Sequence, residues 1–285
     1  MPPLHSASPV FQFRPTTLRS VSRPLTTTTT SSAPSHSIHP SEITHFNALA
    51  SSWWDPHGPS RLLHQMNPLR HDFLRDSCVP HRPRRRFLDV GCGGGIFAES
   101  AARLPHTTHV TGLDPSPEVL RVARVHRRRD PALLAPAARL QYRSGTVEAL
   151  AGDGAATPRF DVVTAFEVLE HVRGPEEFLR ACWGLVAPGG WLVGSTIARA
   201  WTAWVTAKVV AEEVWGVVPR GTHEWERFVQ PEEVRAWTVG RGGADDGEAV
   251  EWRVRGVVYV PGWGWRVVEG SEGWGNYFFG VRKRE

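Results

Sequence analysis

A glycine-rich loop constrains the fold of this chain more than any other feature. Residues 88–95 read LDVGCGGG; they overlap a short apolar run at 86–90 and lead into a helical pattern at 96–103. A buried strand that ends in glycines and leads into a helix offers free backbone N–H groups and a positive potential to a ligand. Glycines also let a ligand approach the backbone closely. The loop therefore predicts a strand–helix unit that binds a small molecule.

Strands and helices alternate along much of the chain. Further strands are expected at 109–113, 140–144, 160–166 and 191–196, with helices at 118–129 and 175–185. This alternation is typical of an α/β fold, a Rossmann-like doubly wound sheet that is mostly parallel and covered on both faces. After residue 196 we expect helices at 201–215 and 231–239, a loop at 241–248, and strands at 251–260 and 274–282 that form an antiparallel C-terminal edge.

Two aspartates discriminate between classes of ligand. Gly93, Gly95 and Ala98 fit a degenerate dinucleotide-binding pattern, G-x-G-x-x-A. Asp89, however, ends the strand just before the glycines, where a carboxylate would repel a pyrophosphate. It suits instead the ammonium and sulfonium groups of S-adenosylmethionine (SAM). Asp114 ends the next strand. In nucleotide-binding folds, an acidic residue at this position accepts hydrogen bonds from ribose hydroxyls. These residues favour a SAM site.

Several stretches carry a resemblance to a known family. They read FNALASSWWD at 46–55, LHQMNPLR at 63–70, LDVGCGGG at 88–95, AES at 98–100, VTGLD at 110–114, FDVVTAFEVLEHV at 160–172, PGG at 188–190 and VPRGTHEW at 218–225. With these stretches the chain resembles the class I SAM-dependent methyltransferases and, more narrowly, the ubiquinone-biosynthesis O-methyltransferases. The glycine loop alone indicates a methyltransferase; the WWD, NPLR and PRGTHEW stretches narrow the family.

The resemblance implies a substrate class and a set of cofactor contacts. It implies methylation of the catechol-type hydroxyls of 3,4-dihydroxy-5-polyprenylbenzoate and demethylubiquinol. It also implies SAM contacts at Arg70, Gly91, Asp114 and Phe166, and we assign Gly93 of the same loop to the cofactor site. Arg70 can pair with the methionyl carboxylate of SAM, and Phe166 offers a flat apolar surface to adenine. Many relatives carry Met where this chain has Phe166.

Three polar side chains follow the strand expected at 160–166. Glu167, Glu170 and His171 are expected at its carboxyl end, where ligands collect in doubly wound sheets. The resemblance implies that they bind Mg²⁺, which would lower the pKa of a chelated catechol below the value of about 10 of a free phenol. In a second interpretation His171 is the catalytic general base. In a third, Glu170 and His171 only hydrogen-bond the following turn.

The first forty residues are expected to be a targeting segment. Residues 1–41 contain no Asp or Glu, and they carry Arg14, Arg19 and Arg23 among many serines and prolines. An acid-free, Arg- and Ser-rich N-terminus is typical of a mitochondrial transit peptide; a disordered tail with no targeting role is the alternative. We assign residues 1–40 to this segment and residues 41–285 to the methyltransferase domain.

A polyprenylated acceptor resides in a bilayer, so we expect the enzyme to contact one. The sequence has no apolar run of about 18 residues that could span a membrane. In segment 200–218, Trp201, Trp204 and Trp215 share a helical face that suits the headgroup level; a helix packed over the active site is the alternative. Arginine clusters at 82–86 and 121–129 would attract anionic lipids or lie on solvated faces.

These observations lead to expected partners and a location. We expect a protein peripheral to the mitochondrial inner membrane, on its matrix side, within a multi-subunit coenzyme Q biosynthesis complex. No aromatic-basic recognition motif accompanies the arginine clusters, so we expect no nucleic-acid partner. The three cysteines are odd in number and far apart, which argues against a disulfide framework and against a CxxC-type zinc site.

Two other functions are compatible with the sequence. Ala198 stands where the family usually has Asn, before Arg199, so a polar contact near the substrate is expected to be missing. The chain would then be a non-catalytic SAM-binding scaffold of the biosynthetic complex. Alternatively it is a methyltransferase of another specificity, such as C-methylation of a quinone ring. Residues 127–139 are expected to form an inserted loop.

Overall fold

The computed structural model describes residues 38, 40–78, 84–134, 139–154, 158–199, 227–240 and 249–285. Several sequence-based expectations fall outside these residues. They are the targeting segment up to residue 37, the helix at 201–215 with its membrane-facing tryptophans, the PRGTHEW stretch, and the loop at 241–248.

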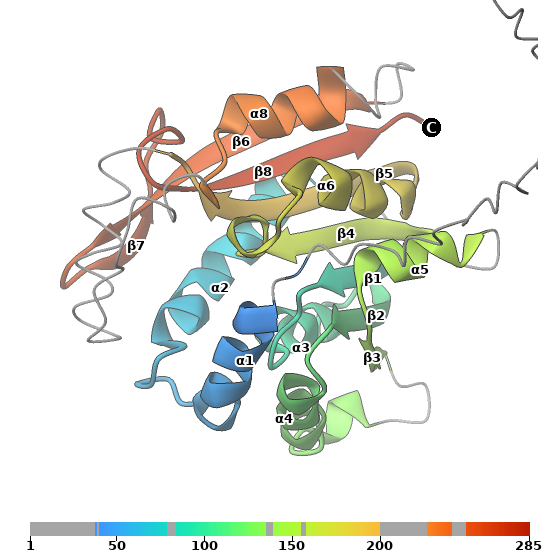
Figure 1. The fold of residues 1–285 in the computed structure, drawn as a ribbon, viewed down its shortest axis with the longest axis vertical. Helices are drawn as coiled ribbons and strands as arrows, with labels where there is room; N and C mark the ends of the chain where they lie inside the picture. Colours follow the sequence, from blue (N-terminus) through green and yellow to red (C-terminus); the bar gives the residue numbers. More distant parts are fainter. Residues whose placement is uncertain are drawn as a thin grey trace, which may run out of the picture. The chain divides into compact units, whose positions relative to one another are not determined.

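An eight-stranded sheet forms the centre of the described chain, in the order β3-β2-β1-β4-β5-β8-β6-β7 (Figure 1). Strands β1 to β5 pair in parallel, while β8 pairs antiparallel with both β5 and β6. Their bounds are β1 Arg85–Val90, β2 Thr107–Asp114, β3 Leu140–Ser144, β4 Phe160–Phe166, β5 Val186–Ile197, β6 Ala249–Val260, β7 Gly264–Val267 and β8 Asn276–Lys283. The predicted α/β fold with an antiparallel C-terminal edge is confirmed.

The chain changes direction across the sheet between β1 and β4. From β1 the next strands in sequence, β2 and β3, lie on one side, whereas β4 and β5 lie on the other. Such a reversal opens a crevice at the carboxyl ends of the two strands, where open α/β sheets bind ligands. The glycine loop after β1 and the polar residues after β4 both border this crevice.

Helices cover both faces of the sheet. Buried residues of α2 (Arg61–Phe73), α3 (Ile96–Ala102) and α4 (Pro117–Arg127) join one core cluster. Those of α5 (Val147–Gly152), α6 (Pro175–Gly184) and α8 (Pro231–Arg235) join a second. A smaller cluster, which includes Ala50, Trp53, Ile96 and Val119, forms beside α1 (Pro40–Leu49) and the start of α4.

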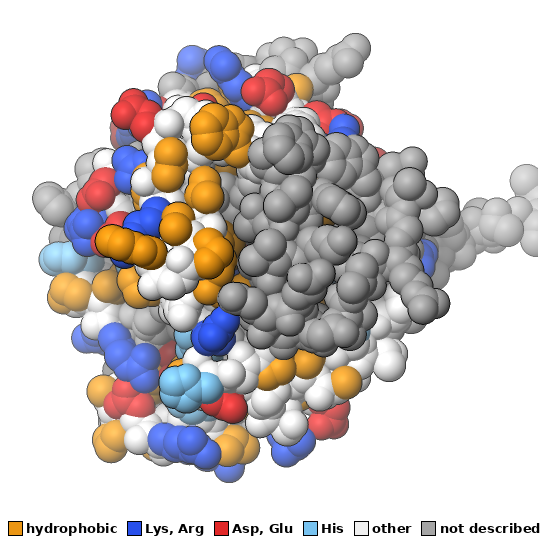
Figure 2. Space-filling view, turned by 90° about the vertical axis from the view of Figure 1, so that its left-hand side faces the viewer, with side chains coloured by type: hydrophobic (Ala, Val, Ile, Leu, Met, Phe, Trp, Pro, Cys, Tyr) orange, Lys and Arg blue, Asp and Glu red, His pale blue; other side chains and the backbone are white. Residues whose placement is uncertain are grey.

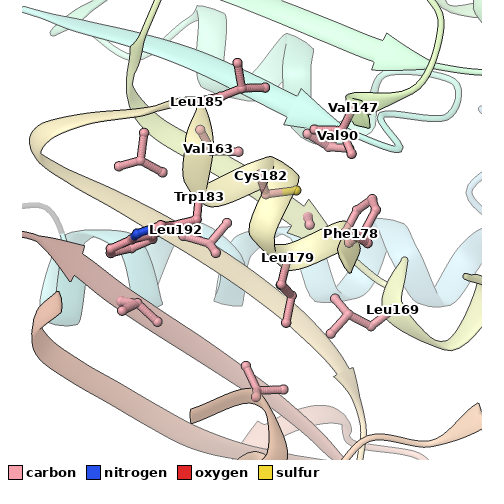
Figure 3. Close-up of a cluster of buried hydrophobic side chains, with 14 of the residues drawn as sticks. Val90, Val147, Val163, Leu169, Phe178, Leu179, Cys182, Trp183, Leu185 and Leu192 are labelled. Carbon is pink, nitrogen blue, oxygen red and sulfur yellow. The ribbon is translucent and has the colours of Figure 1, made fainter. Parts of the chain in front are cut away.

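The packing of α6 shows how sequence pattern becomes a core. Phe178, Leu179, Cys182 and Trp183 are spaced so that they share one helical face, and all of them are buried. Figure 3 shows these side chains in one cluster with Val163 of β4 and Leu192 of β5. The thiols of Cys92 and Cys182 are free and buried, so within the described chain they contribute to packing.

The structure corrects some expected boundaries. Strand β5 begins at Val186 and not at 191, because the PGG stretch forms a bulge within the strand: Phe160 pairs with Val186, and Val162 pairs with Trp191. At Gly190 a Cβ would lie 2.8 Å from two backbone oxygens, so the bulge requires glycine. The sequence patterns missed α5 and β7 because both are short.

Two further segments differ in detail from expectation. The helix expected at 231–239 is α8 followed by a π-helical turn at Ala236–Gly240. In the expected inserted loop, α4 ends at Arg127 and a 3₁₀ turn at Pro131–Leu133 buries Leu133 in the core; residues 135–138 lie outside the described chain.

Tyr277 gives a test of how the C-terminal edge is held. Its hydroxyl is buried in β8 and donates to the carbonyl oxygen of Val229 at 2.8 Å, which ties the segment before α8 to the sheet. We expect Tyr277→Phe to lower the free energy of unfolding by about 1 kcal/mol, because the carbonyl loses its partner. Urea unfolding measures this change. Tyr259→Phe is the control, since the Tyr259 hydroxyl makes no hydrogen bond with the described residues, and an equal loss there would contradict the assignment.

Candidate active site

Asp114 connects the glycine loop to the start of α4. Its two carboxylate oxygens accept hydrogen bonds from the backbone N–H groups of Gly93 and Ser116, each at 2.9 Å. The Ser116 hydroxyl also caps α4 by accepting from Val119 N–H at 3.1 Å. Burial raises the pKa of Asp114 to about 6, and the two backbone hydrogen bonds oppose this shift. The residue predicted to bind ribose thus organises the loop between β1 and α4.

The glycines of the loop make room for the protein's own aromatic rings. Gly93 has φ +53°, and a Cβ there would lie 2.3 Å from the Trp53 ring; at Gly95, with φ +91°, it would lie 2.1 Å from the Tyr142 hydroxyl. Trp54 donates from Nε1 to the Gly94 carbonyl oxygen at 2.8 Å. The WWD stretch and Tyr142 thus occupy the side of Gly93, Gly94 and Gly95 to which a Cβ would point. The expectation that the loop backbone admits a ligand stays a prediction.

Asp89 and Arg70 form a buried pair of opposite charges with unused hydrogen-bonding capacity. Thr164 on β4 lies opposite Asp89 on β1, and its hydroxyl donates to Asp89 Oδ1 at 2.8 Å. Asp89 Oδ2, Arg70 Nε and Arg70 Nη2 are buried without a hydrogen-bond partner in the described part of the chain. Burial raises the pKa of Asp89 to about 7, although Thr164 and the charge of Arg70 act in the opposite direction.

Arg70 is surrounded by groups that sequence analysis placed in the site. It is buried in α2, and its guanidinium lies 4.9 Å from the centre of the Phe166 ring. Burial lowers its pKa, against the raising effects of Glu167, Asp89 and Glu170. A guanidinium stays charged in proteins. Arg70 therefore lies among carboxylates that balance its charge, while its Nε and Nη2 donors have no hydrogen-bond partner in the described chain.

These unpaired atoms fit the amino-acid group of SAM, whose carboxylate and ammonium are attached to the same carbon. A carboxylate ligand would accept hydrogen bonds from Arg70 Nε and Nη2, and an ammonium group would donate one to Asp89 Oδ2. Because a buried polar group without a partner costs about 1–3 kcal/mol, such a ligand would relieve an existing penalty. The fit agrees with the predicted contact at Arg70 and with the charge argument made for Asp89.

Glu167 is held in a strained conformation at the end of β4. Its φ is +55°, the only positive value for a non-glycine residue in the described chain. Its carboxylate accepts from the Ser195 hydroxyl at 2.6 Å and from Asn276 Nδ2 at 3.1 Å. These partners come from β5 and β8, so the strained residue is fixed by the two neighbouring strands.

Glu170 and His171 lie in the 3₁₀ turn Leu169–His171 and contact different partners. The Thr196 hydroxyl donates to Glu170 Oε2 at 2.8 Å, and burial together with the charge of Glu167 raises the pKa of Glu170 to about 7. His171 Nδ1 lies 3.0 Å from Glu42 Oε2. Burial lowers the pKa of His171, but the bond with Glu42 and the charge of Glu170 outweigh it, so the pKa is raised.

Glu42 also binds Arg227, at 2.8 Å, and its contacts bring α1 to the site. The hydrogen bond from His171 is the main reason that the pKa of Glu42 is lowered to about 2. The Phe46 ring, one turn further along α1, packs edge-on against the His171 ring, and the two ring centres are 5.1 Å apart. A carboxylate on Nδ1 selects the tautomer in which Nε2 is the basic nitrogen.

The expected Mg²⁺ set does not fit this arrangement. Glu167 bonds Ser195 and Asn276, while Glu170 bonds Thr196 and His171 bonds Glu42. No group of three or more His, Cys, Asp or Glu side chains in the described chain is placed to hold a metal ion. The three side chains would have to leave these partners and converge, so no reaction step is assigned to a metal here.

Sequence analysis missed several residues that complete the site. Thr164, Thr196, Ser195 and Asn276 supply hydroxyl and amide donors to the three carboxylates of the site, and Glu42 supplies the acceptor for His171. The pairing of Asp89 with Thr164 follows from strand register, which no local pattern reveals. Glu42 precedes His171 by 129 positions. Its one detectable signal was its place as the first acidic residue of the chain.

At position 198, where the family usually has Asn, the structure shows a buried alanine. Ala198 is fully buried in the core cluster that contains Val229 and Val234. Arg199 follows it and donates to the carbonyl oxygen of Phe228 at 3.0 Å and to the Glu233 carboxylate at 3.2 Å. Position 198 therefore contributes to packing, and Arg199 braces the segment that leads into α8.

Comparison with known proteins places this chain among methyltransferases. A family described as "Methyltransferase domain" matches residues 60–242. The mitochondrial ubiquinone biosynthesis O-methyltransferase of Candida albicans is 36% identical, over 85% of this chain and 84% of its own length. A ubiquinone biosynthesis O-methyltransferase of Albidiferax ferrireducens is 45% identical, over 70% of this chain and 74% of its own length.

A solved structure confirms the fold independently of close relatives. A SAM-dependent methyltransferase from Thermotoga maritima superposes with a TM-score of 0.54 at 16% identity, covering 85% of this chain and 99% of that chain. At this identity the likeness concerns the fold alone. Within the described residues, the helices are too short or too polar to cross a membrane.

The buried Asp89 predicts a pH dependence of stability. Its pKa rises from an ordinary 3.8 to about 7 in the folded state. Between these values the folded protein holds a proton that the unfolded chain has released, so raising the pH through this window lowers the free energy of unfolding. Asp89→Asn removes this fall in unfolding free energy, because an amide does not ionise. We expect the variant to gain stability over the wild type as pH rises from about 4 to about 7, by on the order of 1.4 kcal/mol per pH unit.

Urea unfolding of both proteins across that pH range measures the difference. A difference in unfolding free energy that stays constant with pH would show that Asp89 ionises in the fold as it does in the unfolded chain.

Proposed function

This chain belongs to the ubiquinone biosynthesis O-methyltransferases, and from that premise we propose that its acceptors are the catechol-type hydroxyls of 3,4-dihydroxy-5-polyprenylbenzoate and demethylubiquinol. It is a SAM-dependent enzyme that methylates oxygen in the synthesis of ubiquinone. The observation that carries the proposed chemistry is the cluster at the ends of β1 and β4. There, atoms of Arg70 and Asp89 have no hydrogen-bond partner among the described residues, and the charges of Glu167 and Glu170 act on Arg70.

Different residues of this chain would contact different parts of the methyl donor. SAM supplies an already activated methyl group on a sulfonium. Arg70, whose guanidinium lies against the Phe166 ring, would hold its carboxylate; Asp89 would face its ammonium, and Asp114 with the Gly91–Gly93 backbone would border the sugar. Because the donor is activated in advance, the enzyme mainly orients the two reactants and excludes water.

In the proposed mechanism, His171 accepts the proton of the attacking hydroxyl. Glu42 holds Nδ1, so Nε2 is the nitrogen that takes the proton. Glu170 and Glu42 stabilise the imidazolium that forms, because both raise the pKa of His171. Thr196 in turn keeps the Glu170 carboxylate in position. The mechanism needs no movement of the three side chains from the partners they have in the structure.

The location follows from a relative and from the acceptor. The Candida albicans relative carries the word mitochondrial in its name. An acid-free N-terminus supports the same compartment for this chain, with residues 1–40 as a transit segment. A prenylated acceptor supports peripheral contact with the inner membrane on the matrix side, and membership of a coenzyme Q biosynthesis complex.

Accumulation of a dihydroxylated polyprenylbenzoate in a deletion strain tests the acceptor assignment; an unchanged lipid profile would contradict it.

Arg70→Met tests the cofactor site. The substitution keeps the apolar stem but removes the guanidinium, and we expect SAM affinity to fall by about 10- to 100-fold, the loss of a charged hydrogen bond. Titration calorimetry with SAM and with its demethylated product measures the affinity. Arg75→Met is the control, because Arg75 lies five residues after the end of the family stretch at 63–70, is exposed, and pairs with Asp72 and Asp76. Equal affinity in the wild type and in Arg70→Met would remove Arg70 from the site.

His171→Ala tests the proton acceptor. We expect turnover of a soluble catechol to fall by about 10²- to 10⁴-fold, the usual worth of a positioned general base, while SAM binding is retained. Glu170→Ala and Glu42→Gln are each expected to lower turnover less than the His171 change, with SAM binding likewise intact, because both carboxylates act through the pKa of His171. Turnover unaffected by the His171 and Glu170 changes would defeat the assignment.

Chelation of divalent ions in the same assay separates the two roles considered for these residues. Turnover that survives EDTA assigns the proton to His171. Turnover that is lost with EDTA and returns only with added Mg²⁺ assigns Glu167, Glu170 and His171 to a metal site. O-methylated product identified by mass spectrometry excludes ring C-methylation, and any turnover excludes a non-catalytic scaffold.

A further inference from the structure

Two of the stretches that carry the family resemblance meet in the fold. The NPLR stretch at 67–70 lies in α2 and the AES stretch at 98–100 lies in α3. They are joined by the hydroxyl of Ser100, which lies 3.0 Å from Asn67 Nδ2 and 2.7 Å from His71 Nε2. Asn67 and His71 stand on either side of Arg70 along α2. Ser100 therefore links α3 to two residues that flank the guanidinium of the cofactor site.

The Ser100 hydroxyl uses its full hydrogen-bonding capacity in this position. A serine hydroxyl has one proton to donate and two lone pairs that accept. Its proton goes to the α3 backbone, where the carbonyl oxygens of Phe97 and Ile96 lie at 2.8 and 3.1 Å. Both lone pairs then accept, one from Asn67 Nδ2 and one from the N–H group at His71 Nε2. One small side chain thus receives two donors from the neighbouring helix.

His71 bonds Ser100 as a neutral imidazole. Burial and the positive charge of Arg70 lower the pKa of His71 to about 4, against the raising effect of Asp72. At neutral pH the ring therefore carries one proton, and the contact with a hydroxyl whose own proton is already donated assigns that proton to Nε2. Nδ1 is buried without a hydrogen-bond partner in the described chain. The histidine beside Arg70 thus adds no second positive charge to the site.

Ring contacts connect the same residues to Arg70 by a second route. The His71 ring stacks on the Phe97 ring with 5.1 Å between ring centres, and Phe97 packs edge-on against Phe166 at 4.7 Å. The Arg70 guanidinium lies 4.9 Å from the centre of the Phe166 ring. These four side chains close a circuit through α2, α3 and β4. A shift of α2 against α3 therefore moves the guanidinium relative to Phe166.

The other end of α2 is held by a different part of the sheet. Trp265 of β7 is buried and donates from Nε1 to the Leu62 carbonyl oxygen at 3.1 Å. Figure 2 looks onto the end of the molecule where β7 and α2 lie in Figure 1, and hydrophobic side chains gather there. Leu62 precedes Arg70 by more than two helical turns, whereas the residues that bond Ser100 lie within about one turn of it. Of these two anchors, Ser100 is the closer to Arg70 along the helix.

We propose that Ser100 is a positioning residue that sets how tightly the enzyme holds the amino-acid group of SAM. Its hydroxyl fixes Asn67 and His71, and through them it orients the guanidinium of Arg70. A forked contact between a guanidinium and a carboxylate depends on orientation as well as distance, so a small displacement of α2 weakens it. The proposal rests on the proposed contact between Arg70 and the SAM carboxylate, and it holds for any acceptor.

Two ligands separate the positioning of Arg70 from a general effect on the fold. S-adenosylhomocysteine, the demethylated product of SAM, carries the amino-acid group, whereas 5′-methylthioadenosine keeps the adenosine and the sulfur but lacks that group. Titration calorimetry measures the affinity of the full chain for each ligand. The variants are Ser100→Ala, Asn67→Ala, Arg70→Met and the double variant Ser100→Ala/Arg70→Met. Urea unfolding gives the folded fraction of each variant, so that the affinities refer to folded protein.

Thr238→Val is the matched control. The Thr238 hydroxyl is buried and, like that of Ser100, donates to a carbonyl oxygen four residues earlier, that of Val234 at 2.7 Å. It lies in the turn after α8, whose neighbouring residues Trp237 and Val239 pack on the second core cluster, away from α2 and α3. The control therefore removes the same kind of helical hydroxyl without touching the link to Arg70.

We expect Ser100→Ala and Asn67→Ala to bind S-adenosylhomocysteine about three- to tenfold more weakly, the usual size of coupling between residues in one hydrogen-bond network. Their affinity for 5′-methylthioadenosine should equal that of the wild type, and Thr238→Val should leave both affinities unchanged. In the Arg70→Met background, Ser100→Ala should cause no further loss, because its effect passes through the guanidinium.

Three results would overturn the proposal. They are unchanged affinity of Ser100→Ala for S-adenosylhomocysteine, an equal loss of affinity for both ligands, and a loss in the double variant that is the sum of the two single losses. If Arg70→Met itself binds S-adenosylhomocysteine as tightly as the wild type, the Arg70 contact fails and the proposal fails with it. If Arg70→Met loses this affinity but Ser100→Ala keeps it, the cofactor contact stands and only the positioning role fails.

Discussion

The site depends on a positive charge that the protein buries but does not fully pair. Arg70 lies at the carboxyl ends of β1 and β4, against the Phe166 ring, with the charges of Asp89, Glu167 and Glu170 acting on it. Nε and Nη2 of its guanidinium have no hydrogen-bond partner among the described residues. Burying such a group costs free energy unless a ligand completes its hydrogen bonds. The folded protein therefore carries a free-energy cost that binding of a carboxylate would remove.

The surrounding structure keeps this cluster in place through bonds between distant elements. Thr164 holds Asp89 across β1 and β4, Ser195 and Asn276 hold Glu167 across β5 and β8, and Glu42 brings α1 onto His171. Each of these bonds joins a charged residue to a neighbour from another strand or helix. The antiparallel strands at the sheet edge therefore contribute directly to the site, through Asn276 in β8 and through the hairpin that extends beyond it.

Much of the site was predictable because its residues lie in short local patterns. The glycine loop, Asp89 and Asp114 identified a strand–helix–strand unit and its ligand class, and the FEVLEH stretch placed Glu167, Glu170 and His171 at the end of β4. The partners of these residues were not predictable, because each pairing depends on strand register or on contacts between elements far apart in sequence. The aromatic rings that pack against the glycines were not predictable either: Trp53 lies against Gly93 and Tyr142 against Gly95.

The sequence by itself determined the alternation of the longer strands and helices and the family, because periodicity, turn residues and motifs are local properties of the chain. Only the tertiary structure decided that Glu167, Glu170 and His171 bond separate partners, where a shared Mg²⁺ ion was expected. It also decided that Asn67 and His71 share the Ser100 hydroxyl, since that follows from how α2 and α3 pack. Such placements arise from packing and register, which no segment of the chain sets alone.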